Sequence, residues 1–346
     1  MTAPFAFAAI GLNHGHIYDQ TRAMLAAGCR LKSFHAPEDD SSAAYGAAFP
    51  GATRVPDERA VLDDPEIRLV LGAGIPADRA PMAVRAMRAG KDVMLDKPGA
   101  TTLEQLAELR RVQRETGRIL SIYYSEHYGQ RATVEAGRLV QAGAIGRVIQ
   151  TIGLGPHRLG ASRPDWFYRR ERYGGILCDI ASHQVEQFLF FTGSNSAEVS
   201  ASEVGNFGFP DTPELEDFGQ MILRSPHATG YIRVDWYTPE GLPVWGDGRL
   251  FLLGTEGTIE LRKYVDVAGR PGGDHLFLTD RTGVRHVDCS GTALPYGDDL
   301  RNDVNDRTET AMPQAHCFYA MEVALRAQAQ ATRIAGGERP ATRAAP

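Results

Sequence analysis

The sequence has few cysteines, no long apolar run and no basic cluster. Its four cysteines, at positions 29, 178, 289 and 317, are widely spaced, which excludes a disulfide framework or a C-x-x-C zinc site. We therefore expect no metal and a reducing cytoplasmic location. No apolar run reaches the roughly 18 residues of a membrane span, and the start lacks the basic segment of a signal peptide. A net charge of −6 without Lys/Arg clusters argues against nucleic-acid or membrane partners.

The chain is too long for a single ordinary core. With 346 residues, it is predicted to form two domains. We place a first domain at residues 1–125, a second at 126–335, and a flexible tail at 336–346, where Gly, Pro, Ala and Arg are frequent.

Strand-like and helix-like segments alternate through the first part. Strands are predicted at 5–10, 30–34, 67–73, 92–95 and 118–124, with a short one near Val55, and helices at 15–27, 41–48, 78–89 and 101–116. This rhythm predicts an α/β fold with a doubly wound parallel sheet, as in a Rossmann domain.

The first strand-to-helix turn partly matches the dinucleotide fingerprint G-x-G-x-x-G. It reads Gly11, Leu12, Asn13, His14, Gly15, His16, so only the first glycine is in place. The second strand ends at His35 and the acidic run 38–40 follows, which leaves NAD and NADP open with a slight preference for NAD. The fifth strand ends in Asp96 and Lys97, at the edge where such sheets bind ligands.

A glycine pair in the middle of the chain opens a segment with two titratable groups. Gly174 and Gly175 precede an apolar, helix-compatible run that carries Asp179 and His183. On one helix these two side chains share a face. The carboxylate would then orient an imidazole that transfers protons.

Together, Asp96-Lys97-Pro98 and Gly174-Gly175-x-x-x-Asp179-x-x-x-His183 resemble the Gfo/Idh/MocA family of oxidoreductases over nearly the whole chain. The resemblance implies Lys97, Asp179 and His183 as catalytic residues and a cofactor contact at the turn containing Ile75 and Pro76. It also implies a second α+β domain with a large, mostly antiparallel sheet, a homodimer or homotetramer, and a possible cis bond before Pro98. Asp96 departs from the family's usual Glu, and Ile176 from its third glycine.

The second part is predicted to contain a helix at 130–142, several strands separated by short turns, an irregular connection at 290–310 and a final helix at 313–331. Polar and aromatic side chains are candidates to line a pocket for a small hydroxylated substrate: Tyr124, His157, Arg158, Arg163, Trp166 and Tyr173. Trp236 and Trp245 are assigned to packing.

The expected reaction is NAD(P)-dependent hydride transfer at a secondary alcohol of a sugar, polyol or sugar acid. His183 would act as general base, Asp179 would orient it, and Lys97 would stabilise the alkoxide. Two alternatives share the fold: an NAD-dependent glycoside hydrolase, and a non-catalytic nucleotide-sensing regulator. The intact Lys97, Asp179 and His183 argue against the regulator.

Overall fold

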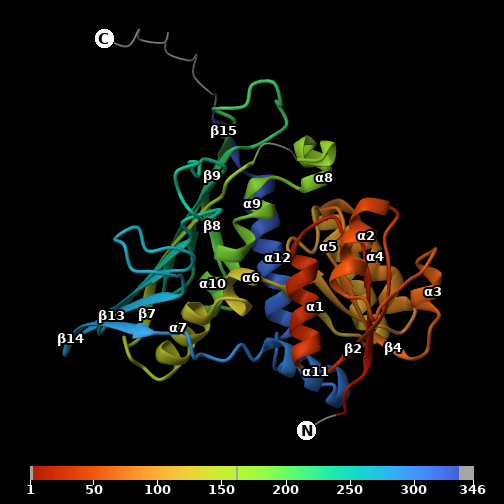
Figure 1. The fold of residues 1–346 in the computed structure, drawn as a ribbon. Helices are drawn as coiled ribbons and strands as arrows, with labels where there is room; N and C mark the ends of the chain where they lie inside the picture. The colour runs from red at the N-terminus through yellow and green to blue at the C-terminus, as the bar shows by residue number, and fades with distance from the viewer. Residues whose placement is uncertain (1–2, 161–162, 335–346) are drawn as a thin grey trace.

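Residues 3–160 and 163–334 are described by the computed structural model, and their strands form two sheets (Figure 1). The first sheet is parallel, in the order β3-β2-β1-β4-β5-β6. Its strands are β1 (Ala6–Ile10), β2 (Arg30–His35), β3 (Thr53–Arg54), β4 (Ile67–Gly72), β5 (Asp92–Asp96) and β6 (Leu120–Tyr123). All side chains of β1, β5 and β6 are buried, as expected where helices cover both faces. The predicted Rossmann sheet is confirmed.

Helices connect these strands. They are α1 (His16–Ala26), α2 (Asp39–Ala48), α3 (Arg59–Leu62), α4 (Pro76–Arg88) and α5 (Leu103–Thr116). The ends of α5 show why the sequence folds this way locally. The Thr102 hydroxyl accepts a hydrogen bond from the Gln105 N–H at 3.1 Å, which satisfies a free donor of the first turn. Gly117 ends the helix in the left-handed region, with φ of 62°.

The second sheet has nine strands in the order β14-β13-β12-β11-β7-β10-β9-β8-β15. They are β7 (Val148–Pro156), β8 (Glu198–Gly205), β9 (Phe218–Arg224), β10 (Thr229–Asp235), β11 (Arg249–Gly254), β12 (Thr258–Arg262), β13 (His275–Asp280), β14 (Gly283–Asp288) and β15 (Thr332–Ile334). The mostly antiparallel sheet is confirmed. The short turns between the predicted strands suggest a simple antiparallel meander, but β7 inserts between β10 and β11 and runs parallel to β10.

Helices cover one face of this sheet. The longer ones are α7 (Arg131–Gln141) and α10 (Ser182–Thr192), which contact β12 and β7. The short helix α6 (Ser125–Tyr128) precedes α7, and three short helical turns lie between α7 and α10 in the chain: η1 (Asp165–Tyr168), α8 (Arg170–Tyr173) and α9 (Ile176–Asp179). The predicted helix at 130–142 corresponds to α7.

The last helices return to the first sheet. Residues 290–310, expected to be irregular, contain α11 (Tyr296–Asp306), which packs against α1. Tyr296, Leu300 and Val304 join the apolar core that contains Phe7 of β1. Helix α12 (Gln314–Ala329) lies between the two sheets (Figure 1), and contacts both β6 and β8. Apolar contact with a distant core, rather than local pattern, therefore stabilises α11.

The segment after 125 thus contributes to both cores, and the two-domain division at that residue remains a proposal. The tail at 336–346 lies outside the described residues. Within residues 3–160 and 163–334, no helix combines the length and the apolar character needed to cross a bilayer. All four cysteines are free and buried, as expected from their spacing.

Candidate active site

The turn between β1 and α1 can hold a phosphate-containing cofactor. Gly11 has φ of 78°, and a Cβ there would lie 2.8 Å from the Cα of Gly74, so only glycine fits. In the part of the chain that the structure describes, the backbone N–H groups of Leu12, Asn13 and Gly15 donate to no protein group. Free N–H groups at the start of a helix, on the carboxyl edge of a parallel sheet, suit a pyrophosphate.

An acidic side chain reaches this turn from the end of β2. Asn13 Nδ2 donates to Glu38 Oε1 at 2.8 Å, and the second Glu38 oxygen is buried without a partner among the described residues. His35 is the last residue of β2, and its Nδ1 donates to Val55 O at 3.2 Å. Glu38 was part of an acidic run in the sequence, but its contact with the turn depends on the fold.

Ile75 and Pro76 begin α4 at the same edge of the sheet. The cofactor contact that the family resemblance implies here stays a prediction, and Ala77 stands where the family's turn has Asn. The neighbouring Gly74 gives the close approach to Gly11 described above.

Asp96, at the end of β5, is buried among cationic and imidazole groups. Arg79 Nη2 lies 3.0 Å from Asp96 Oδ2, and His16 Nδ1 lies 2.8 Å from Oδ1. Burial alone would raise the pKa of the Asp96 carboxyl, but His16, Arg79 and His14 together hold it well below its usual range. His14 accepts a hydrogen bond from the His16 N–H, and burial lowers its pKa. Sequence reasoning missed Arg79, which is 1% exposed.

Lys97 and Asp179 form a buried ion pair across 82 positions of sequence. Lys97 Nζ donates to Asp179 Oδ1 at 2.9 Å, and the two residues are 4% and 9% exposed. Arg79 holds the backbone here, because its Nη1 donates to Lys97 O and its Nε to Gly74 O. The Lys97–Pro98 bond is cis, as the family resemblance implied. Because its Nζ binds Asp179, the Lys97 ammonium points into the interior, toward the second part of the chain.

Asp179 and His183 do not share one helix. The chain breaks between α9 and α10 at Ile180–Ala181, and the prediction of a continuous helix is wrong. Among the described residues, Asp179 binds Lys97 and no hydrogen bond joins it to His183. The carboxylate is therefore positioned to fix Lys97, rather than to orient the imidazole as we expected.

The glycine pair before α9 is explained by close packing. Gly175 has φ of 92°, and a Cβ there would lie 2.3 Å from the amide of Gln328 in α12. The Gln328 Oε1 accepts from Leu177 N at 2.9 Å and from Cys178 N at 3.3 Å, so it caps the short helix. Helix α12 thereby holds the segment that carries Asp179.

His183 lies at the centre of the site, 1% exposed. Burial lowers the pKa of this imidazole well below its usual value, and Lys97, His16 and Lys263 act in the same direction. The Tyr124 ring lies 6.0 Å away and the His16 ring 6.3 Å, both edge-on. An imidazole that is neutral at neutral pH can accept a proton, as a general base must.

His157 remains a candidate for substrate binding. Its Nδ1 donates to Gly155 O at 3.0 Å, which leaves Nε2 as an acceptor. Burial lowers the pKa of this histidine to about 4. Its ring packs on Trp236 and Trp245, at 5.3 and 4.3 Å.

Other predicted substrate residues make hydrogen bonds within the fold. The Tyr173 hydroxyl donates to Glu214 O and accepts from Glu216 N. Arg158 donates to the carbonyls of Pro239 and Leu242.

Arg163 donates to Leu159 O, and its guanidinium lies 4.9 Å from the Phe167 ring. Trp166 packs edge-on against the same ring, at 5.8 Å. The hydrogen bonds of Arg163 and Tyr173 are made within the protein, whereas Arg158 Nε is buried without a hydrogen-bond partner among the described residues. A substrate contact by Arg158, Arg163, Trp166 or Tyr173 therefore stays a prediction. Tyr124 differs, since its buried hydroxyl has no partner among the described residues.

A second buried ion pair lies behind His183 and carries no sequence signal. Lys263 Nζ binds Glu126 Oε2 at 2.6 Å and Gln187 Oε1 at 3.1 Å. Gln184 Nε2 donates to the same Glu126 oxygen at 2.9 Å. A charged pair in an apolar core requires such additional hydrogen bonds. These hydrogen bonds connect α10, which carries His183, to α6, which follows Tyr124.

Two cavities flank this centre, each of about 670 Å³. One is lined by His16 and Ser125 on one side and by Trp245 and Tyr264 on the other. Trp245 packs against His157 and Tyr264, as assigned, and at 41% exposure it also lines this cavity.

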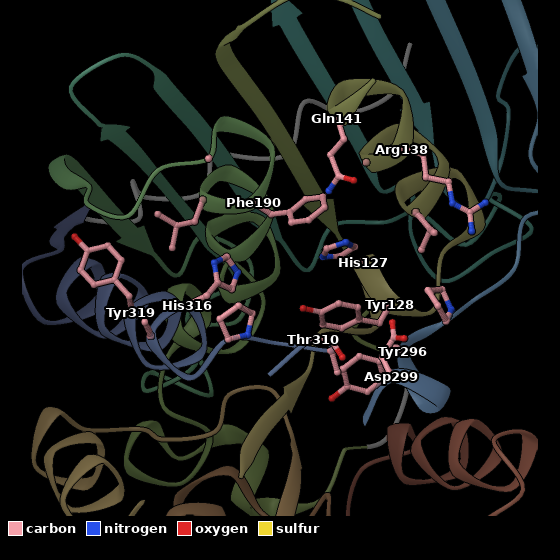
Figure 2. Close-up of a pocket in the computed structure, with 18 of the residues that line it drawn as sticks. His127, Tyr128, Arg138, Gln141, Phe190, Tyr296, Asp299, Thr310, His316 and Tyr319 are labelled. Atoms are coloured by element: carbon pink, nitrogen blue, oxygen red, sulfur yellow. The ribbon is translucent and has the colours of Figure 1, made fainter. Parts of the chain in front are cut away.

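The other cavity is shown in Figure 2. Tyr128 and Tyr296 stack together beneath His127, and His316 lies farther along the cavity wall. Behind it, the buried Glu186 binds both His127 Nδ1, at 3.0 Å, and His316 Nε2, at 3.1 Å. Lys97, Asp179 and His183 do not line either cavity.

A Rossmann sheet, a phosphate-binding turn and a buried Lys–Asp–His centre define a dehydrogenase-like protein of two α/β parts. Comparison with known proteins agrees. The oxidoreductase family model for an NAD-binding Rossmann fold matches residues 5–124, and the GFO/IDH/MocA C-terminal domain model matches residues 133–260. The chain belongs to the Gfo/Idh/MocA family of oxidoreductases.

Individual relatives support the same assignment. A crystal structure from Erwinia carotovora atroseptica, assigned as an oxidoreductase, is 45% identical with a TM-score of 0.93, covering 95% of this chain and 99% of that one. D-xylose dehydrogenase of Paenarthrobacter nicotinovorans is 32% identical over 37% of this chain and 34% of its own length. Scyllo-inositol 2-dehydrogenase (NAD(+)) of Bacillus subtilis is 26% identical over 59% and 57%. The chain thus spans between a third and three fifths of the length of these two curated relatives.

Proposed function

We propose that this protein catalyses reversible hydride transfer between a nicotinamide cofactor and a secondary alcohol of a sugar, polyol or sugar acid. The observation that carries the proposal is a buried ammonium, Lys97, that acts electrostatically on a buried neutral imidazole, His183, whose ring lies 6.3 Å from that of His16 in the turn suited to a phosphate. The names of related dehydrogenases support the alcohol as substrate class.

The protein's own residues have separate tasks. The backbone of the turn at 11–16, with Ile75 and Pro76, would hold the cofactor, which supplies the hydride chemistry when bound. His183 takes the hydroxyl proton, because burial keeps its imidazole neutral. Lys97 donates a hydrogen bond to the alcohol oxygen and stabilises the negative charge that develops there. Asp179 fixes the Lys97 ammonium at 2.9 Å.

We propose NAD as the preferred cofactor, and this proposal rests on the position of Glu38. This carboxylate lies at the turn, where an acidic side chain binds the ribose 2′-hydroxyl of NAD and repels the 2′-phosphate of NADP. The neighbouring Arg54 is paired with Asp39 at 2.8 Å and so is less available to a phosphate. Fluorescence titration should show tighter binding of NADH than of NADPH. Glu38→Gln should reduce that difference, and equal affinities in the unaltered protein would contradict the proposal.

A substrate screen tests the reaction itself. Purified protein is mixed with NAD or NADP and a panel of sugars, polyols and sugar acids, and absorbance is followed at the reduced-nicotinamide band. Substrate-dependent formation of reduced cofactor, lost in His183→Gln, is expected. If nucleotide binds but no member of the panel is oxidised, aryl glycosides are the next test. Aglycone release without net reduced cofactor would establish the hydrolase alternative instead.

We further propose that the uncovered face of the nine-stranded sheet joins copies of this chain into a homodimer or homotetramer. Ile222, Leu253 and Val284 are 44%, 41% and 72% exposed on strands of this sheet. Exposed apolar side chains gathered on one surface favour association. Sedimentation should show an oligomer that Leu253→Glu weakens, and a monomer at micromolar concentration would contradict this. A cytoplasmic location is supported by the four free thiols.

A further inference from the structure

His183 is too deeply buried to exchange a proton directly with solvent. It is 1% exposed, and each turnover in the oxidation direction would leave one proton on it. An imidazolium at such a site is unfavourable, since burial lowers its pKa. The proton must therefore leave through a neighbouring group before the next cycle. Lys97 does not provide that exit, because its ammonium is already protonated and bound to Asp179.

His16 is the neighbour that connects this interior to a cavity. Its ring centre lies 6.3 Å from that of His183, and its side chain is 24% exposed. It lines the cavity of about 670 Å³ together with Ser125 and Trp245. Tyr124 lies at a similar distance from His183, 6.0 Å, but is fully buried and reaches no such space.

The hydrogen bonds of His16 suit proton transfer. Its Nδ1 lies 2.8 Å from Asp96 Oδ1, so this nitrogen carries the proton and the carboxylate fixes the ring. Its Nε2 is left as the acceptor and lies 3.3 Å from the hydroxyl of Ser125. Arg79 in turn fixes Asp96 at 3.0 Å. His14 is less suitable, because its Nδ1 already accepts from the His16 backbone N–H.

We propose that His16 is the proton outlet of the site, an inference that rests on the proposed alcohol oxidation. The N–H bond of the His183 imidazolium breaks, the proton passes across one bridging water or hydroxyl group, and an N–H bond forms at Nε2 of His16. His16 then releases the proton to the cavity beside Ser125. One proton leaves for each alcohol oxidised, and reduction uses the same path in reverse. His16 acts through His183 and does not contact the reacting carbon.

The test compares His16→Gln with His227→Gln in the full-length protein, using NAD and the best substrate from the screen. Glutamine keeps the size and polarity at position 16 but transfers no proton. His227 lies in the turn before β10, where its Nε2 bonds Thr192 O, and serves as the control. Thermal unfolding verifies that both variants are folded. If His16→Gln is not folded, His16→Asn replaces it.

The expected result is a change in rate without a change in cofactor affinity. His16→Gln should lower kcat for oxidation by about 10-fold or more in dilute buffer, at the lower end of general acid–base effects. The Kd for NADH should stay within about threefold, a free-energy change below ~1 kcal/mol. Added imidazole should restore the rate in a saturable way, and should not affect the unaltered protein or His227→Gln.

Two results would overturn the outlet. One is a kcat within about twofold of the unaltered protein, a barrier change of only ~0.4 kcal/mol. The other is a loss of kcat that is accompanied by weaker NADH binding and is not restored by imidazole. That result would assign His16 to cofactor binding. Failure of the proposed function is distinguishable, because the unaltered protein would then form no reduced cofactor with any substrate.

Discussion

Replacing Lys97 separates its effect on catalysis from its effect on folding. In Lys97→Ala the Asp179 carboxylate, 9% exposed, loses its only ion pair among the described residues. Removing one partner of a buried pair typically costs about 3–5 kcal/mol, because the remaining charge stays desolvated. Since Asp179 keeps slight access to solvent, we expect the lower end of that range. The double variant Lys97→Ala/Asp179→Ala should regain most of this stability.

Activity should behave differently from stability in these variants. Loss of a donor to the developing alkoxide typically lowers kcat about 10²–10³-fold. Because the double variant also lacks the ammonium, it should be as inactive as the single one. Lys32→Ala is the matched control, since Lys32 forms its ion pairs with Asp64 and Glu66 at the surface, away from the site.

Two measurements check this prediction. Urea unfolding gives the free energy of each variant, and reduced-cofactor absorbance gives kcat under saturating substrate. If Lys97→Ala keeps kcat within about tenfold of the unaltered protein, alkoxide stabilisation by Lys97 is wrong, because less than ~1.4 kcal/mol would have been lost. If the double variant is as unstable as the single one, the ion pair is not the source of the lost stability.

Three further changes give distinct results. Gly11→Ala should abolish NADH binding in fluorescence titration, because its methyl group would lie 2.8 Å from the backbone of Gly74 between β4 and α4. Gly28→Ala is the control: Gly28 also has a positive φ, 82°, but its Cβ would meet no atom within 4 Å, so this variant should bind NADH normally. Gly175→Ala should lower the thermal midpoint and kcat together, since its methyl group would lie 2.3 Å from the side chain that caps α9. His157 has a folded pKa of about 4, below its unfolded value, so the unfolded state binds more protons and stability should fall between about pH 6.5 and pH 4. His157→Gln should flatten this slope, which is at most about 1.4 kcal/mol per pH unit, in urea unfolding at several pH values; an unchanged slope would contradict the assignment.

Local features of the sequence determined the first sheet and much of its turn. Apolar runs of strand length alternate with helix-length segments, and this period alone specifies a parallel sheet with crossover helices. Gly11 and Gly175 were recognisable because positive φ and close backbone approach both require a residue without Cβ. Lys97 was placed correctly as well, since its position at the end of a strand fixes the edge of the sheet where it lies.

Contacts between distant segments required the tertiary structure. Asp179 is four positions from His183 but binds Lys97, because the helix breaks at Ile180 and the ammonium arrives from 82 positions earlier. Helix α11 was missed because its stabilisation comes from the core of the first sheet rather than from its own pattern. The pairing of His16 with Asp96, and of Lys263 with Glu126, likewise has no local signal. Periodicity and turn chemistry act over a few residues, whereas burial and charge pairing depend on which segments the fold brings together.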